Sequence, residues 1–170
     1  MADTIAERLR GLLASDVYTA KGRLRADDLL IRERVAGSLG QASARLRDLA
    51  ARWRADRVPP STRENPFPAT EVMAPLRQAD RLGKDIDTVS TSVRGLPLLN
   101  QDKVWDRVRN VGLDELLQFD WTLVGEADAL SLALADADGL DTVDMAALEA
   151  RLRQIREVIA DRGRYIELLA

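Results

Sequence analysis

The sequence contains neither cysteine nor histidine. Without cysteine, a disulfide framework, a thiolate zinc site and a thiol nucleophile are all excluded. Without histidine, imidazole acid–base catalysis and histidine-ligated metal centres are excluded as well. Any enzymatic reaction would have to use carboxylates, arginines or hydroxyls alone, and we expect no cofactor. The absence of cysteine also agrees with a reducing compartment.

Long apolar runs are absent too. No uninterrupted apolar stretch approaches the roughly 18 residues of a membrane-spanning helix. The first residues include Asp3, Glu7 and Arg8, which place charges where a secretory signal would carry an apolar run. The sequence therefore predicts a cytoplasmic protein.

Basic residues are scarce in one segment of the chain, and the charge balance differs between the two ends of the sequence. Residues 1–57 hold 12 Lys/Arg against 8 Asp/Glu, whereas residues 98–150 hold 3 against 12. The overall net charge is only -3. The two halves are therefore expected to attract one another.

Proline is missing between Asp3 and Arg57, and apolar residues recur throughout that segment at helical spacing. A single helix over about 3–57 would span roughly 80 Å at 1.5 Å per residue. Gly22, Gly37 and Gly40 are the positions where such a helix would bend. Because the apolar phase continues across them, we predict one long or gently kinked helix.

The clearest pattern in the chain is an apolar stripe whose members follow one another at spacings of four and three residues. This period is typical of a helix that packs along another helix, as in a coiled coil. Arg45 and Arg52 flank the stripe, where coiled coils place charges that select a partner. The stripe consists of Val35, Leu39, Ala42, Leu46, Leu49 and Trp53.

Four prolines between residues 58 and 73 predict an irregular loop, because proline removes a donor and disfavours helix before it. The loop either contacts a partner or merely crosses one end of a bundle. Further helices are predicted over about 74–94, 100–111, 114–135 and 142–169, the last capped by Asp141 or Thr142. Arg162 interrupts the apolar stripe of that last helix.

No segment alternates with the two-residue period of a strand. The chain is therefore predicted to be all-α, a single domain over 1–170 that forms an antiparallel bundle of four to five helices with coiled-coil-like packing. Of the three tryptophans, Trp121 is the one least explained by an apolar stripe. It is a candidate interface residue, because tryptophan is enriched at interfaces.

Acidic residues suggest an alternative, a carboxylate-only magnesium-dependent hydrolase or a small-ligand site in the bundle. Asp27 and Asp28 lack the third carboxylate that diphosphate binding needs one turn later, and the acidic turn 136–144 does not fit the register of a calcium loop. A metal site would require several of the remaining acids to face one another, although we expect them on solvated faces: Asp102, Asp106, Asp114, Glu115, Asp120 and Glu126.

Arginines around Trp53, from Arg45 to Arg63, suggest a second alternative, weak binding of nucleic acid or of an anionic membrane. The interspersed Asp48 and Asp56 and the pI near 5.1 oppose it. The apolar stripe that begins at Ile5 and Leu9 is expected to be a packing face rather than a membrane anchor.

These observations favour a non-enzymatic helical interaction, scaffold or adaptor protein that binds a protein partner or a second copy of itself through its N-terminal helix. Nucleic acid and membrane are disfavoured as partners. The candidate interface comprises Val35, Leu39, Leu46, Leu49, Trp53, Arg45, Arg52 and Trp121.

Overall fold

The computed structural model describes residues 5–13, 24–63, 67–96 and 112–169. Within these ranges the backbone forms α-helices and one 3-10 turn, and no strand is present. The all-α prediction is confirmed. The elements are α1 (Ile5–Leu13), α2 (Leu24–Arg57), α3 (Thr70–Arg94), α5 (Leu113–Ala135), η2 (Leu140–Thr142) and α6 (Met145–Leu169).

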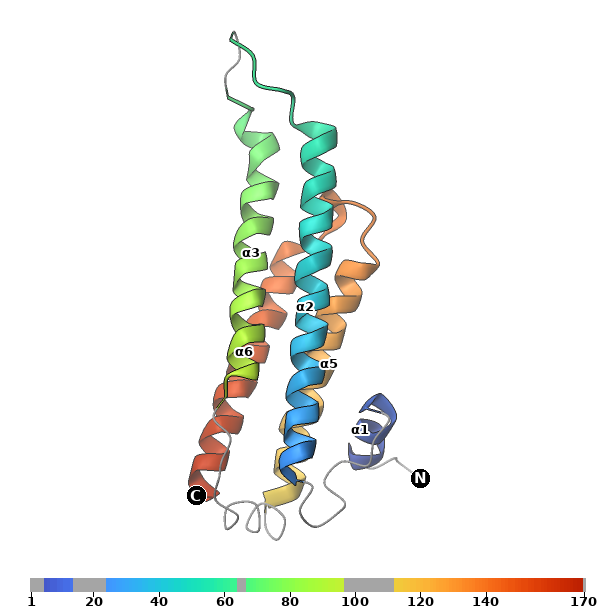
Figure 1. The fold of residues 1–170 in the computed structure, drawn as a ribbon, viewed down its shortest axis with the longest axis vertical. Helices are drawn as coiled ribbons and strands as arrows, with labels where there is room; N and C mark the ends of the chain where they lie inside the picture. The colour runs from blue at the N-terminus through green and yellow to red at the C-terminus, as the bar shows by residue number, and fades with distance from the viewer. Residues whose placement is uncertain (1–4, 14–23, 64–66, 97–111, 170) are drawn as a thin grey trace.

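Four of the helices form an up-down-up-down bundle (Figure 1). Each neighbours two others, because α2 packs against α3 and α5, and α6 closes the ring by packing against α5 and α3. The short α1 lies beside α5 and the adjoining end of α2 (Figure 1). The predicted antiparallel bundle of four to five helices is therefore confirmed.

The core forms along the bundle axis from the four-and-three stripes of each long helix. Leu39 of α2, Ile86 of α3, Val124 of α5 and Ile155 of α6 are all completely buried. With 34 residues, α2 is about 51 Å long. Its C-terminal turns and the first turns of α3 extend beyond the other two helices as a helical hairpin (Figure 1).

The single helix predicted over 3–57 is wrong. Residues 5–13 and 24–57 form two helices, and α1 lies beside α2 rather than on its axis (Figure 1). This arrangement buries Leu9 completely, whereas a straight continuation would leave its apolar face in solvent. Gly37 and Gly40 lie within the unbroken α2, and Gly22 lies outside the described residues.

Two predicted helix starts are also corrected. Helix α3 begins at Thr70 rather than at residue 74, so that Pro75 lies inside the helix and the irregular loop ends at Ala69. Helix α6 is capped by Asp144, whose Oδ1 accepts a hydrogen bond from the backbone N–H of Ala147 at 3.0 Å. The predicted caps were Asp141 and Thr142.

The remaining boundaries need less revision. Helix α5 matches its predicted range of 114–135 to within one residue. The helix predicted over 100–111 lies outside the described residues.

Leu39 provides a test of the core. We expect Leu39→Ala to lower the free energy of unfolding by about 2–5 kcal/mol, because it removes buried contacts and leaves a cavity. Leu132→Ala is the matched control, since Leu132 of α5 is 61% exposed and its truncation should cost about 0.5 kcal/mol or less. Urea unfolding followed by circular dichroism measures both. Equal losses would contradict the placement of the α2 stripe in the core.

Candidate functional site

Charged side chains are buried where α2, α5 and α6 meet. Arg162 of α6 donates from Nε to Asp120 Oδ1 of α5 at 2.7 Å, and from Nη2 to Asp28 Oδ1 of α2 at 2.5 Å. Both carboxylates are completely buried. One guanidinium therefore joins three helices in the interior of the bundle.

Arg32 extends this cluster towards the end of α3. Its Nη2 lies 2.7 Å from Asp28 Oδ2, and its Nη1 donates to the carbonyl oxygen of Leu96 at 2.6 Å. The contact with Oδ2 is close enough for an ion pair but is not aligned as a hydrogen bond, and Arg32 Nε also has no hydrogen-bond partner. Charge attraction therefore holds Arg32 against Asp28, whereas a hydrogen bond holds it to Leu96.

The buried ion cluster, Asp28, Arg32, Asp120 and Arg162, fits a structural role. The carboxylates of Asp28 and Asp120 are completely buried and paired with Arg162, so neither is accessible to a substrate. Buried ion pairs contribute little net stability, but breaking one leaves an uncompensated buried charge. The expectation that Asp120 lies on a solvated face is wrong, because Asp120 is completely buried. Arg162 interrupts the apolar stripe of α6 because it pairs with Asp28 and Asp120.

Tyr165 lies one turn beyond Arg162 on α6. Its hydroxyl donates to the carbonyl oxygen of Gly112 at 3.1 Å, and its ring lies 5.7 Å from that of Phe119. Burial, and then the negative charge of Glu115, raise the pKa of Tyr165 above its ordinary 10.0. The hydroxyl therefore stays protonated at neutral pH and keeps this contact between α6 and the start of α5.

The apolar members of the predicted interface are part of the chain's own core. Val35, Leu39, Leu46 and Leu49 are each at most 1% exposed, because α3 and α5 cover them. They offer no accessible surface in the folded bundle. A partner could reach this stripe only if neighbouring helices separated from α2.

The polar and aromatic members of the predicted interface have separate roles. Arg45 donates to the carbonyl oxygens of Leu134 at 3.3 Å and Ala137 at 2.7 Å, so it caps the C-terminal end of α5. Arg52 is exposed on α2. Trp53, half-buried one residue later, donates from its indole N–H to the carbonyl oxygen of Val72 at 3.0 Å.

Trp121 is half-buried on α5, on the side of that helix against which α1 packs. The guanidinium of Arg8 is 5.8 Å from the centroid of its ring, within the range of a cation–π contact. Trp121 therefore helps to hold α1 against the bundle, alongside the buried Leu9.

The acids considered for a metal site do not converge. Asp114 and Glu115 are exposed at the start of α5, and Glu126 accepts a hydrogen bond from Arg151 at 2.7 Å. Asp102 and Asp106 lie outside the described residues. In the part of the chain that the structure describes, no group of three carboxylates has an arrangement that could hold a metal ion.

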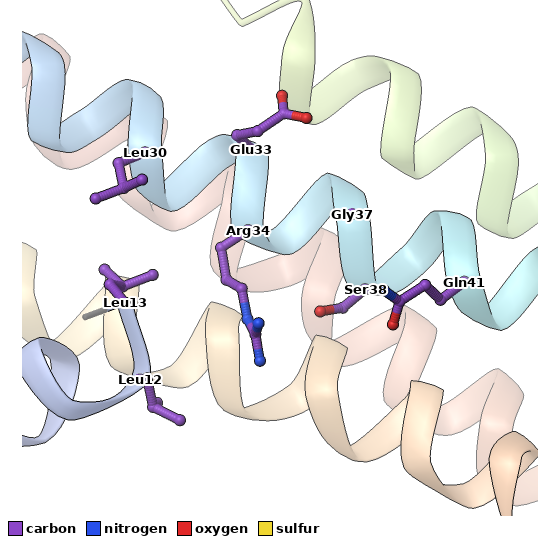
Figure 2. A pocket seen from close by; sticks show the side chains of 8 residues that line it. All are labelled: Leu12, Leu13, Leu30, Glu33, Arg34, Gly37, Ser38 and Gln41. Carbon is purple, nitrogen blue, oxygen red and sulfur yellow. The ribbon is translucent and has the colours of Figure 1, made fainter. Parts of the chain in front are cut away.

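A groove of about 320 Å³ opens between the C-terminal end of α1 and α2 (Figure 2). Its polar end is satisfied within the chain, because Arg34 Nη2 lies 2.8 Å from Asp128 Oδ2 and Ser38 Oγ donates to Asp128 Oδ1 at 2.5 Å. Its apolar end is open. The lining residues are Leu12, Leu13, Leu30, Glu33, Arg34, Gly37, Ser38 and Gln41.

Comparison with known proteins adds no functional assignment, because no family model, no curated protein and no solved structure matches the chain. Among the helices described, none combines the length and the apolar character needed to cross a membrane. The functional argument therefore rests on the geometry of the bundle and its surface.

The buried ion cluster predicts an unusually damaging arginine substitution. We expect Arg162→Ala to lower the free energy of unfolding by about 3–5 kcal/mol, because Asp28 and Asp120 would remain buried without their shared cation. Arg164→Ala is the matched control, since Arg164 pairs with Asp161 on the surface, and it should cost about 1 kcal/mol or less.

A double variant separates a lost charge pair from lost packing. Asp120→Asn with Arg162→Met removes one buried acid together with its arginine and leaves Asp28 paired with Arg32, so we expect the double variant to be more stable than Arg162→Ala alone. Thermal and urea unfolding measure the wild type and the three variants. A cost for Arg162→Ala no greater than that of Arg164→Ala would show that the cluster does not hold the helices together.

Proposed function

We propose that this protein is a non-enzymatic helical interaction protein that associates with a second copy of itself through its N-terminal region. The supporting observation is the exposure of three leucines where α1 meets α2. Leu12 is 38% exposed, Leu29 47% and Leu30 36%, and two of them line the groove shown in Figure 2. Clustered apolar side chains at a surface mark interaction sites.

Other exposed large apolar side chains do not form such a cluster. Phe67 lies in the loop before α3, Leu132 on α5 and Leu168 at the end of α6. Single exposed leucines are ordinary on a protein surface. The surface around Leu12, Leu29 and Leu30, here called the α1–α2 surface, differs because Leu12 and Leu30 line a groove.

Charge favours a second copy as the occupant of this surface. The groove is lined by one acid, Glu33, and one base, Arg34, both exposed, so it is locally neutral on a chain of net charge -3. A two-fold interface brings the same patch of each copy together. Two locally neutral patches do not repel one another when they meet there.

The enzymatic alternative has less support. The buried carboxylates Asp28 and Asp120 are bound by Arg162, and the surface acid Glu126 by Arg151. The nucleic-acid or anionic-membrane alternative would use the exposed arginines in the C-terminal turns of α2. The exposed Asp56 among them would repel a phosphate group. Our proposal includes a cytoplasmic location, in line with the lack of cysteine.

Leu30 tests the proposed self-association. We expect the wild-type chain to form a dimer and Leu30→Glu to be a monomer, because a charge in the apolar end of the groove would be buried unpaired at the interface. Leu132→Glu, on exposed α5 surface, should remain a dimer. Sedimentation equilibrium up to about 1 mM protein would detect even a weak dimer. A wild-type monomer over that range would refute the proposal.

Gly37 separates loss of association from loss of folding. A side chain at Gly37 would have nothing within 4 Å of its Cβ, so Gly37→Leu should stabilise α2 by about 1 kcal/mol while filling the groove. We therefore expect a more stable monomer. Gly125→Leu is the matched control, because Gly125 has the same open space on α5 outside the groove. A Gly37→Leu protein that still dimerises would exclude the groove from the interface.

A further inference from the structure

A second, smaller pocket lies where the C-terminal turns of α2 adjoin the turn between α5 and α6, far along α2 from the groove of Figure 2. Its volume is about 140 Å³. It is lined by Leu49, Arg52, Trp53, Asp56, Arg57, Asp138, Gly139, Leu140 and Asp141. We call it the α2-end pocket.

The apolar wall of the α2-end pocket is fixed by the fold. Leu49 and Leu140 are buried, and Trp53 is held by the hydrogen bond from its indole N–H to the carbonyl oxygen of Val72. The guanidinium of Arg57 lies 5.2 Å from the centroid of the Trp53 ring. One aromatic ring that accommodates a cation therefore forms part of an apolar wall whose other side chains, Leu49 and Leu140, are aliphatic.

The rim of the pocket carries unpaired charges of both signs. Arg52, Asp56 and Arg57 come from α2, and Asp138 and Asp141 come from the facing turn. None of these five is within the 4.0 Å of an ion pair with any residue that the structure describes. Elsewhere on the surface, oppositely charged neighbours do pair closely: Arg34 with Asp128 at 2.8 Å, and Arg151 with Glu126 at 2.7 Å.

From this arrangement we propose that the α2-end pocket binds a small zwitterion of the size of a free amino acid or a betaine. The ammonium group of such a ligand pairs with Asp138 and Asp141, and its carboxylate with Arg52, whose guanidinium offers a bidentate donor pair. The aliphatic part lies on Trp53 and Leu140. Pockets for drug-sized ligands measure about 300–1,000 Å³, so this one admits only a small molecule.

Tryptophan fluorescence and ligand-observed NMR test the proposal on the full chain. The probes are L-alanine and glycine betaine, which carry both charges, and acetate and methylammonium, which carry one each, all at equal ionic strength. We expect a saturable response to the zwitterions alone, because only they satisfy both sides of the rim. Trp53→Phe should abolish the fluorescence response, since Trp53 lines the pocket.

Matched substitutions locate the site. Asp138→Asn with Asp141→Asn, and separately Arg52→Gln, should each weaken zwitterion binding about tenfold or more, because each removes a charged partner. Asp136→Asn and Arg54→Gln are the controls, since both residues are exposed neighbours that do not line the pocket, and they should leave the affinity unchanged. Melting curves establish that each variant is folded.

Three results would overturn the proposal. The first is the absence of a saturable response to either zwitterion up to about 100 mM, beyond the affinities expected of a specific small-molecule site. The second is an equal response to acetate or methylammonium, which would indicate general ion binding. The third is zwitterion binding that Asp138→Asn with Asp141→Asn leaves unchanged, which would place the site elsewhere.

Discussion

The pairing of Arg162 with Asp28 and Asp120 fixes how the helices of this protein stand against one another. Apolar stripes with four-and-three spacing resemble their own copies shifted by one turn, about 5.4 Å, so packing alone discriminates weakly between registers. A shift of α6 would separate the buried Arg162 from both carboxylates and break two buried ion pairs. The charges therefore specify the register, while the apolar stripes supply the stability.

This constraint also determines which surfaces remain accessible. Because α5 and α6 are held against α2, the apolar stripe of α2 is enclosed, and its members from Val35 to Leu49 belong to the core. The accessible features lie at the periphery, where shorter elements cover α2 incompletely. Near the N-terminal end of α2, helix α1 is only 9 residues long and ends beside the groove that Leu30 lines. Near the C-terminal end of α2, the turn before α6 leaves the α2-end pocket open.

Spacing predicted the helices because a 3.6-residue period is imposed by the backbone itself. Spacing alone could not predict whether the α2 stripe packs against helices of its own chain or of another chain, because both arrangements require the same period. Asp120 was missed although it occupies a core position of α5 between Leu116 and Val124, because a single acid is more often exposed. Opposite charges at core positions of three helices, Asp28, Asp120 and Arg162, were the available signal.

The two accessible surfaces are independent because of the length of α2. Gly37 and Arg52 are 15 positions apart along one unbroken helix, a distance of about 22 Å. Substitutions so far apart with no shared partner act additively on stability. Of the predicted interface residues, Leu49, Arg52 and Trp53 line the α2-end pocket, and Trp121 contacts Arg8 of α1. The sequence could not predict these contacts, because the neighbouring residues come from the α5–α6 turn and from α1, which no local pattern in α2 encodes.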